Sequence, residues 1–151
     1  FNSIDLQGEK LISNVNIRRN YVNAYWDGKA MHYGEGDGRN AGPLTTLDIA
    51  GHEIAHGLTE RTSGLIYRNE SGGMNESFSD IAGFMVEYYA SKYNPSVTPD
   101  WTMGEDTWTP TNGDHRDGLR YLDDPSSDKY SVEHYSLYPR QTEVHGLQGT
   151  S

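Results

Sequence analysis

Residues 45–59 read TTLDIAGHEIAHGLT, and this stretch decides the fold. Its apolar side chains recur at the spacing of one helical face, no proline interrupts it, and a threonine can cap its start. The pattern therefore predicts a helix from Thr45 or Thr46 to about Thr59. The apolar positions are Leu47, Ile49, Ala50, Ile54, Ala55 and Leu58.

This predicted helix contains the motif H-E-x-x-H at residues 52–56. Residues four apart lie on one helical face with Cβ atoms roughly 5–6 Å apart, so His52 and His56 can reach one cation. Glu53 can project toward an open coordination position and take a proton from metal-bound water. Two surface histidines on an amphipathic helix would show the same spacing, so a third ligand elsewhere in the chain must support the metal site.

A second predicted helix supplies that ligand. Asn75 can cap it, and its apolar pattern continues to about Tyr93. Catalytic zinc normally takes three protein ligands, and because the chain has no cysteine the third must be a carboxylate or another histidine. Glu76 is the best candidate. Asp80, one turn further along, can accept the free ring N–H of a ligating histidine.

The sequence outside the two predicted helices indicates a β-rich part before them and an irregular part after them. Residues 11–17 alternate like a strand, and residues 21–26 and 30–33 flank Asp27-Gly28, a dipeptide that favours a two-residue type I′ hairpin turn. Residues 34–43 are rich in glycine and predict a loop, and proline recurs from Pro95 onward. The expected fold class is α+β, in one domain over residues 1–151: a β-rich part and loop (1–44), two metal-binding helices (45–93) and a loop-rich part (94–151).

Composition excludes several classes of protein. The 151 residues carry 12 Lys plus Arg and 22 Asp plus Glu, a net charge of 12 − 22 = −10. That charge disfavours a nucleic-acid partner, which needs clustered cations. No apolar stretch approaches the ~18–20 residues that span a bilayer, so no membrane partner is expected. Any metal must be held by His, Asp or Glu.

Five stretches together resemble the thermolysin-like neutral metalloproteases, gluzincins of peptidase family M4, in their central catalytic portion. They are residues 23–28 (NAYWDG), 48–56 (DIAGHEIAH), 63–67 (SGLIY), 72–80 (GGMNESFSD) and 104–106 (GED), and they occur in family order. The resemblance implies a zincin-like fold. It also implies further family segments outside these residues: a longer β-rich lobe before the hairpin and a helical lobe after the late histidine.

The resemblance also implies a role for each site residue. His52, His56 and Glu76 would bind zinc, Glu53 would be the general base, Asp80 would orient His52, and the backbone carbonyl of Asn75 would orient His56. Tyr67 and His145 would stabilise the tetrahedral intermediate, with Glu143 in a position to orient His145. From the residues alone, Tyr67 could equally be a packed loop residue and His145 a surface residue.

Substrate contacts follow from the same resemblance. The substrate would add as an antiparallel strand along the edge strand from Asn23 to Trp26, with contacts at Asn23, Ala24 and Tyr25. Main-chain pairing of this kind gives broad specificity. Arg120 would hold a substrate carbonyl; the alternative is an exposed arginine that pairs with Asp123 or Asp124. The pocket beside the zinc would favour cleavage before a bulky apolar residue. It would be lined by Leu44, Ile49, Met103 and Leu119.

An acidic set matches the family's structural calcium sites, and hard oxygen ligands suit Ca²⁺. These residues are Asp48, Glu87, Asp100, Glu105 and Asp106. A lone acidic run would more simply form a solvated face, but Asp48 lies one turn before His52, and Glu87 lies on the second predicted helix. This placement favours at least one calcium ion and leaves a second open.

The functional expectation is a secreted zinc endopeptidase that acts on peptides and proteins. Two alternatives stay open. One is an inactive metal-binding fragment or structural module of such a protease, which would need the remaining parts of the fold as partners. The other is a calcium-stabilised binding module in which the H-E-x-x-H motif is fortuitous.

Overall fold

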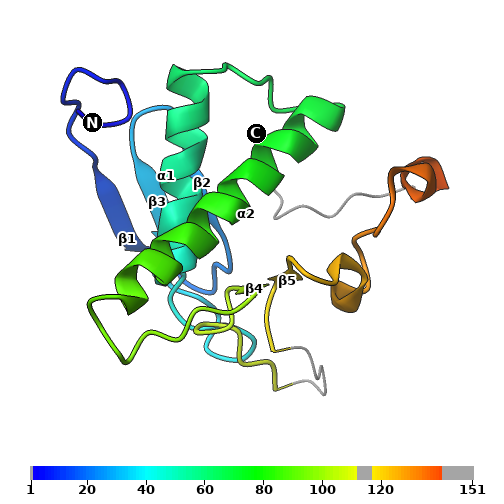
Figure 1. The fold of residues 1–151 in the computed structure, drawn as a ribbon. Helices are drawn as coiled ribbons and strands as arrows, with labels where there is room; N and C mark the ends of the chain where they lie inside the picture. The colour runs from blue at the N-terminus through cyan, green and yellow to red at the C-terminus, as the bar shows by residue number, and fades with distance from the viewer. Residues whose placement is uncertain (1, 112–116, 141–151) are drawn as a thin grey trace.

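Three short strands form one sheet ahead of two long helices, which confirms the α+β class (Figure 1). The computed structural model describes residues 2–111 and 117–140. The strands of the sheet are β1 (Ser13–Ile17), β2 (Ala24–Trp26) and β3 (Met31–Gly34), and the helices are α1 (Leu47–Arg61) and α2 (Asn69–Ser91). After them come β4 (Thr102–Met103), β5 (Arg120–Tyr121) and the 3-10 turns η1 (Pro125–Asp128) and η2 (Tyr135–Arg140).

The sheet order is β1-β3-β2, which leaves β2 at an edge. β2 and β3 pair antiparallel, with Trp26 opposite Met31, so the predicted hairpin is confirmed. Its turn lies one residue later than predicted, because the backbone N–H of Asp27 donates to the carbonyl of Ala30 at 3.1 Å and leaves Gly28 and Lys29 between this pair. Asp27 Oδ1 also accepts the backbone N–H groups of Lys29 and Ala30, both at 2.8 Å. Gly28 has a positive φ of 92° and Lys29 does not, so the turn is not the predicted type I′ turn, which needs positive φ at both central residues.

α1 begins and ends close to the predicted limits, and it contacts both the sheet and α2 (Figure 1). Thr46 occupies the N-cap position, yet its hydroxyl makes no capping hydrogen bond. The inner face of α1 closes the core through Ile49, which is 4% exposed. The core cluster consists of Ala24, Met31, Tyr33, Leu44 and Ile49.

α2 begins at Asn69, six residues before the predicted cap, so the prediction that Asn75 caps this helix is wrong. Gly72 and Gly73 lie inside its first turns. Glycine costs about 1 kcal/mol in a helix interior, and packing between helices routinely outweighs that cost. Asn75 is therefore a buried residue inside the helix, and its side chain is not used as a cap.

The outer face of α2 carries several large apolar side chains that α1 does not cover. Phe78, Ile81 and Met85 are each at least 50% exposed. Over residues 2–111 and 117–140, no helix has the length and the apolar character needed to cross a membrane.

Candidate metal centre and substrate cleft

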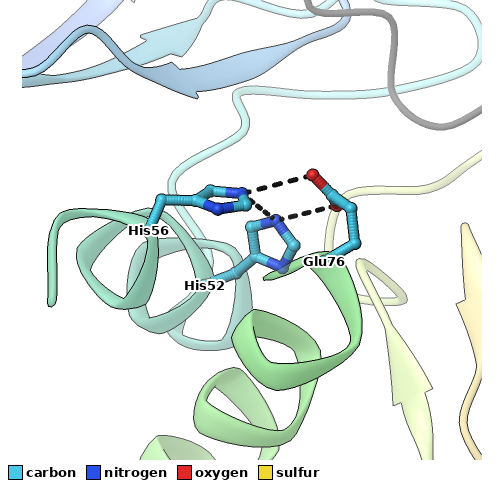
Figure 2. A group of neighbouring side chains, drawn as sticks. All are labelled: His52, His56 and Glu76. Carbon is cyan, nitrogen blue, oxygen red and sulfur yellow. Dashed lines mark hydrogen bonds and ion pairs between the residues drawn. The ribbon is translucent and has the colours of Figure 1, made fainter. Parts of the chain in front are cut away.

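Three donor side chains meet where α1 and α2 pack together (Figure 2). His52 Nε2 lies 3.4 Å from one carboxylate oxygen of Glu76, and His56 Nε2 lies 3.4 Å from the other. The two Nε2 atoms are 2.9 Å apart. Ligands bound tetrahedrally at about 2.0–2.1 Å from one zinc ion would be roughly 3.3 Å apart. The two imidazoles and the carboxylate thus fit a zinc ion in donor type, number and spacing.

Each histidine is held by its other ring nitrogen. His52 Nδ1 lies 2.7 Å from Asp80 Oδ1, and His56 Nδ1 lies 2.7 Å from Asn75 Oδ1. Asn75 thus contacts His56 through its side-chain oxygen, where the sequence suggested the backbone carbonyl. Such contacts fix the ring orientation and leave Nε2 directed at the metal position.

Electrostatics at the three donors reflect their burial and their closeness. Burial lowers the pKa of both imidazoles, but the hydrogen bonds of His52 to Asp80 and Glu76 reverse the shift and raise the pKa of His52. Burial acts to raise the pKa of Glu76, yet its contacts with His52 bring that pKa below the ordinary value. A ligating imidazole must be neutral, so metal binding would release the proton that His52 retains without the ion.

Glu53 is 2% exposed and lines the cleft beside the three donors. Burial raises its pKa to about 7, with His52 opposing and Glu76 adding to the shift. Among the described residues, its Oε2 atom has no hydrogen-bond partner. A carboxylate with a pKa near neutrality and a free oxygen suits a general base.

The cleft has a volume of about 680 Å³ and extends from the donors along the free edge of β2. Asn23, Ala24 and Tyr25 line it, as the sequence suggested. Tyr67 also lines it, with its ring set edge-on against His56 at 5.6 Å and its hydroxyl in contact with Glu76 Oε1. An edge strand beside a row of polar side chains can accept an extended peptide.

Arg120 pairs with Asp80, and neither Asp123 nor Asp124 is its partner. Its Nε donates to Asp80 Oδ2 at 2.8 Å and its terminal nitrogen donates to Oδ1 at 2.6 Å. The same Asp80 oxygen contacts His52, so one carboxylate joins the arginine to a metal donor. Through this bidentate pair, only the carboxylate of Asp80 lies between the guanidinium of Arg120 and the metal donor His52.

The residues expected to form the apolar pocket lie mainly in the core. Leu44 and Met103 are 1% exposed and Ile49 is 4% exposed, while Leu119 packs against the core cluster. None of the four lines the cleft described above. Leu44 and Ile49 pack with residues of the sheet, whereas Met103 of β4 lies beside Gly83 of α2.

The expected calcium ligands are brought together in part. Glu87, Glu105 and Asp106 have carboxylate oxygens within 4.8 Å of one another. Burial and the neighbouring carboxylates raise the pKa of Glu87 to about 7. Asp48 Oδ2 instead accepts the backbone N–H of Gly104, and Asp100 Oδ1 accepts that of Thr102 at 2.7 Å. Both nevertheless contribute negative charge at Glu87.

His145 and Glu143 lie outside the described residues, so the predictions for these two stay open.

The described site defines a class of protein. Its donors are two histidines four residues apart on one helix and a glutamate from the next helix. This is the donor set of an H-E-x-x-H zinc metallopeptidase, in which a further glutamate follows the first histidine. Two family models cover the chain. One, described as "Thermolysin metallopeptidase, catalytic domain", matches residues 1–60, and one described as "Thermolysin metallopeptidase, alpha-helical domain" matches residues 63–149. The chain belongs to the thermolysin metallopeptidase family.

Relatives from several bacteria agree with this assignment. The chain is 46% identical over 137 residues to a bacillolysin of Bacillus cereus, covering 89% of this chain and 23% of the relative. It is 42% identical over 140 residues to the hemagglutinin/proteinase of Vibrio cholerae, covering 93% of this chain and 21% of the relative. The chain therefore spans about a quarter or less of the length of these curated relatives.

A solved structure shares the fold. The precursor of protealysin, a metalloproteinase from Serratia proteamaculans, superimposes with a TM-score of 0.78 at 34% identity. The match covers 97% of this chain and 48% of that chain.

The sequence did not point to Glu60 as a residue of the cleft. Glu60 lines the cleft and accepts the indole N–H of Trp26 at 2.6 Å. A signal for Glu60 was present, because it lies four residues after His56 and eight after His52.

Proposed function

We propose that the protein is a zinc-dependent endopeptidase whose catalytic residues lie at the meeting point of α1 and α2. The observation that carries the proposal is the set of three donors, His52, His56 and Glu76. Glu53 lines the same cleft, and its Oε2 atom has no hydrogen-bond partner among the described residues. Bound there, zinc would polarise the scissile carbonyl and increase the acidity of the attacking water.

The chain's own residues would do the remaining work. Glu53 accepts a proton from the attacking water and passes it to the leaving amine, a role that its pKa of about 7 suits. Tyr67, whose hydroxyl reaches the donor group, would donate to the oxygen on which negative charge develops. The substrate would pair with the edge of β2 at Asn23, Ala24 and Tyr25.

Several finer points belong to the same proposal. We expect peptide and protein substrates, cleavage before bulky apolar residues, and a role for Arg120 and His145 in holding the reacting carbonyl. We also expect calcium at Glu87, Glu105 and Asp106, where Glu87 and Glu105 each leave a buried carboxylate oxygen without a partner among the described residues. Action outside the cell stays a prediction that family membership supports.

The test is cleavage of an internally quenched peptide with leucine after the expected scissile bond. The protein is assayed as prepared, after treatment with a chelator, and after zinc is restored. We expect cleavage that the chelator abolishes and zinc restores. A folded, zinc-loaded sample that cleaves nothing would overturn the proposal and favour an inactive metal-binding module.

A further inference from the structure

The metal-binding face of α1 continues beyond the metal. His52, His56 and Glu60 are spaced four residues apart, so they share one face of the helix, with about 6 Å of axial rise between successive members. The side chain of Glu60 is 47% exposed, and Glu60 lines the same cleft as both histidines. The cleft thus extends at least one helical turn past the donors.

Two contacts fix Glu60 against the hairpin turn. Trp26, the last residue of β2, donates its indole N–H to Glu60 Oε2 at 2.6 Å. A Cβ atom on Gly28 would lie 3.8 Å from Glu60 Oε1, so the carboxylate lies directly beside the turn. Trp26, Asp27 and Gly28 all line the cleft together with Glu60. A peptide that follows the edge of β2 toward the turn would therefore pass this carboxylate.

The end of the cleft beside the hairpin turn carries negative charge. Asp27 and Glu60 are its charged lining residues, whereas Arg18 lines the cleft near Tyr21, over whose ring it stands at 5.1 Å. Arg61 reaches Glu60 only at 3.4 Å, and its guanidinium also contacts Glu9 and the carbonyl of Gly28. Neither Arg61 nor the exposed Lys29 lines the cleft.

A buried carboxylate oxygen in the cleft also indicates that the cleft binds a polar ligand. Glu53, 2% exposed, lines the cleft, and its buried Oε2 has no partner among the described residues. A buried carboxylate oxygen without a partner is costly unless a ligand or solvent satisfies it. The acidic end is therefore part of a built binding cleft.

Resting on the proposed peptidase function, we infer that Glu60, in the cleft that Asp27 also lines, forms a subsite that selects a lysine or arginine side chain of the substrate. An extended peptide advances about 3.3 Å per residue, so the selected side chain lies about two to three residues from the scissile bond, toward the hairpin turn. The aliphatic stem of that side chain would lie along Trp26, and its cationic end would reach Glu60.

The test uses quenched peptides that differ only by Lys or Gln at each of three positions on either side of the scissile bond. We expect one position at which Lys raises kcat/KM about fivefold, the size that an exposed ion pair supports. In Glu60→Gln, which keeps an oxygen that can accept the indole N–H of Trp26, the ratio of kcat/KM for the Lys peptide to that for the Gln peptide should fall to about one. The wild-type ratio should also shrink as ionic strength rises. Glu35→Gln, an exposed carboxylate away from the cleft, should keep the preference.

A preference for Lys that is absent, or that survives in Glu60→Gln, overturns the inference. A binding measurement separates its failure from that of the peptidase proposal. Fluorescein-labelled Lys and Gln peptides are titrated into Glu53→Gln, with and without Glu60→Gln, and anisotropy gives each Kd. Tighter binding of the Lys peptide that Glu60→Gln removes supports the subsite even where no peptide is cleaved. Equal affinities overturn it.

Discussion

At the scale of single residues, Asp80 joins two functional side chains. Its oxygens contact His52 at 2.7 Å and Arg120 at 2.6 and 2.8 Å. Burial acts to raise the pKa of Asp80, but the charge of Arg120 and the hydrogen bond from His52 hold it well below its usual range. Asp80 is therefore ionised at neutral pH, and its charge should support both the orientation of His52 and the position of Arg120.

We predict that Asp80→Asn weakens zinc binding about 10–100-fold, the effect usual for a carboxylate that orients a metal-binding histidine. Competition with a chromophoric chelator measures the affinity. Asp123→Asn removes an exposed carboxylate and serves as the control. An unchanged zinc affinity in Asp80→Asn would contradict this role.

Glu53→Gln tests the general base. The substitution keeps the shape of the side chain, and Glu53 is not one of the three grouped donors, so zinc content by elemental analysis should stay at wild-type level. Turnover of the quenched peptide should fall by about 10²–10⁴-fold, because the proton acceptor is lost. Wild-type turnover in Glu53→Gln would exclude the proposed role.

At the scale of elements, α1 and α2 approach closely through two glycines. A Cβ on Gly51 would lie 3.0 Å from Gly83 Cα, and a Cβ on Gly83 would lie 2.5 Å from the backbone oxygen of Asp48. These contacts set the crossing of the two helices, and the crossing sets the distance between Glu76 and the two histidines. Two glycines that offer no ligand to the metal thus determine the geometry of the donors.

We predict that Gly83→Ala destabilises the fold by about 2 kcal/mol or more, since the added methyl would displace α1. Gly73→Ala is the matched substitution in the same helix, where an added Cβ meets nothing within 4 Å. It should stabilise by about 0.5–1 kcal/mol because alanine favours the helix. Urea unfolding measures both. Equal effects would show that the close approach of α1 and α2 does not limit stability.

The loop between β3 and α1 is organised by one carboxylate. Asp37 Oδ1 accepts the backbone N–H groups of Arg39, Asn40 and Ala41 at 2.9, 2.7 and 3.1 Å. These bonds hold the pKa of Asp37 well below its usual range. The folded state therefore binds the proton of Asp37 less readily than the unfolded chain does.

It follows that Asp37 contributes stability above its unfolded pKa of about 3.9 and loses this contribution as pH falls toward the folded value. The difference in unfolding free energy between wild type and Asp37→Asn should be largest near neutral pH and shrink below about pH 4. Urea titrations over this range provide the measurement. If the difference in unfolding free energy between wild type and Asp37→Asn grew as pH fell, it would contradict the proposed contribution of Asp37.

At the scale of the whole molecule, the proposed zinc ion would link two helices. His52 and His56 come from α1 and Glu76 from α2, and the three donors are grouped only in the folded chain. A ligand that binds only the folded state stabilises it in proportion to the logarithm of its concentration relative to Kd. Metal binding and global stability should therefore be coupled.

Zinc at 100 times its Kd should stabilise the chain by about 2.7 kcal/mol, which corresponds to a rise in Tm of about 5–10 °C for a domain of this size. Differential scanning calorimetry with and without chelator measures the shift. His56→Ala should abolish the shift, whereas His134→Ala, which removes an exposed histidine, should preserve it. A shift that persists in His56→Ala would place the stabilising ion elsewhere.

The sequence by itself determined the α+β class, the position of α1 and the grouping of His52, His56 and Glu76. Helical periodicity is local, and the spacing of the two histidines places them on one face whatever surrounds the helix. The same spacing extends to Glu60, although its neighbours could not be inferred locally.

Only the tertiary structure decided the rest, because it depends on contacts between residues far apart in the chain. Packing against α1 lets α2 begin at Asn69 despite two glycines, and this turns Asn75 from a cap into a partner of His56. Arg120 reaches Asp80 across 40 residues, and Leu44 and Met103 are drawn into the core. Burial and long-range electrostatics set these positions, and neither is encoded in local spacing.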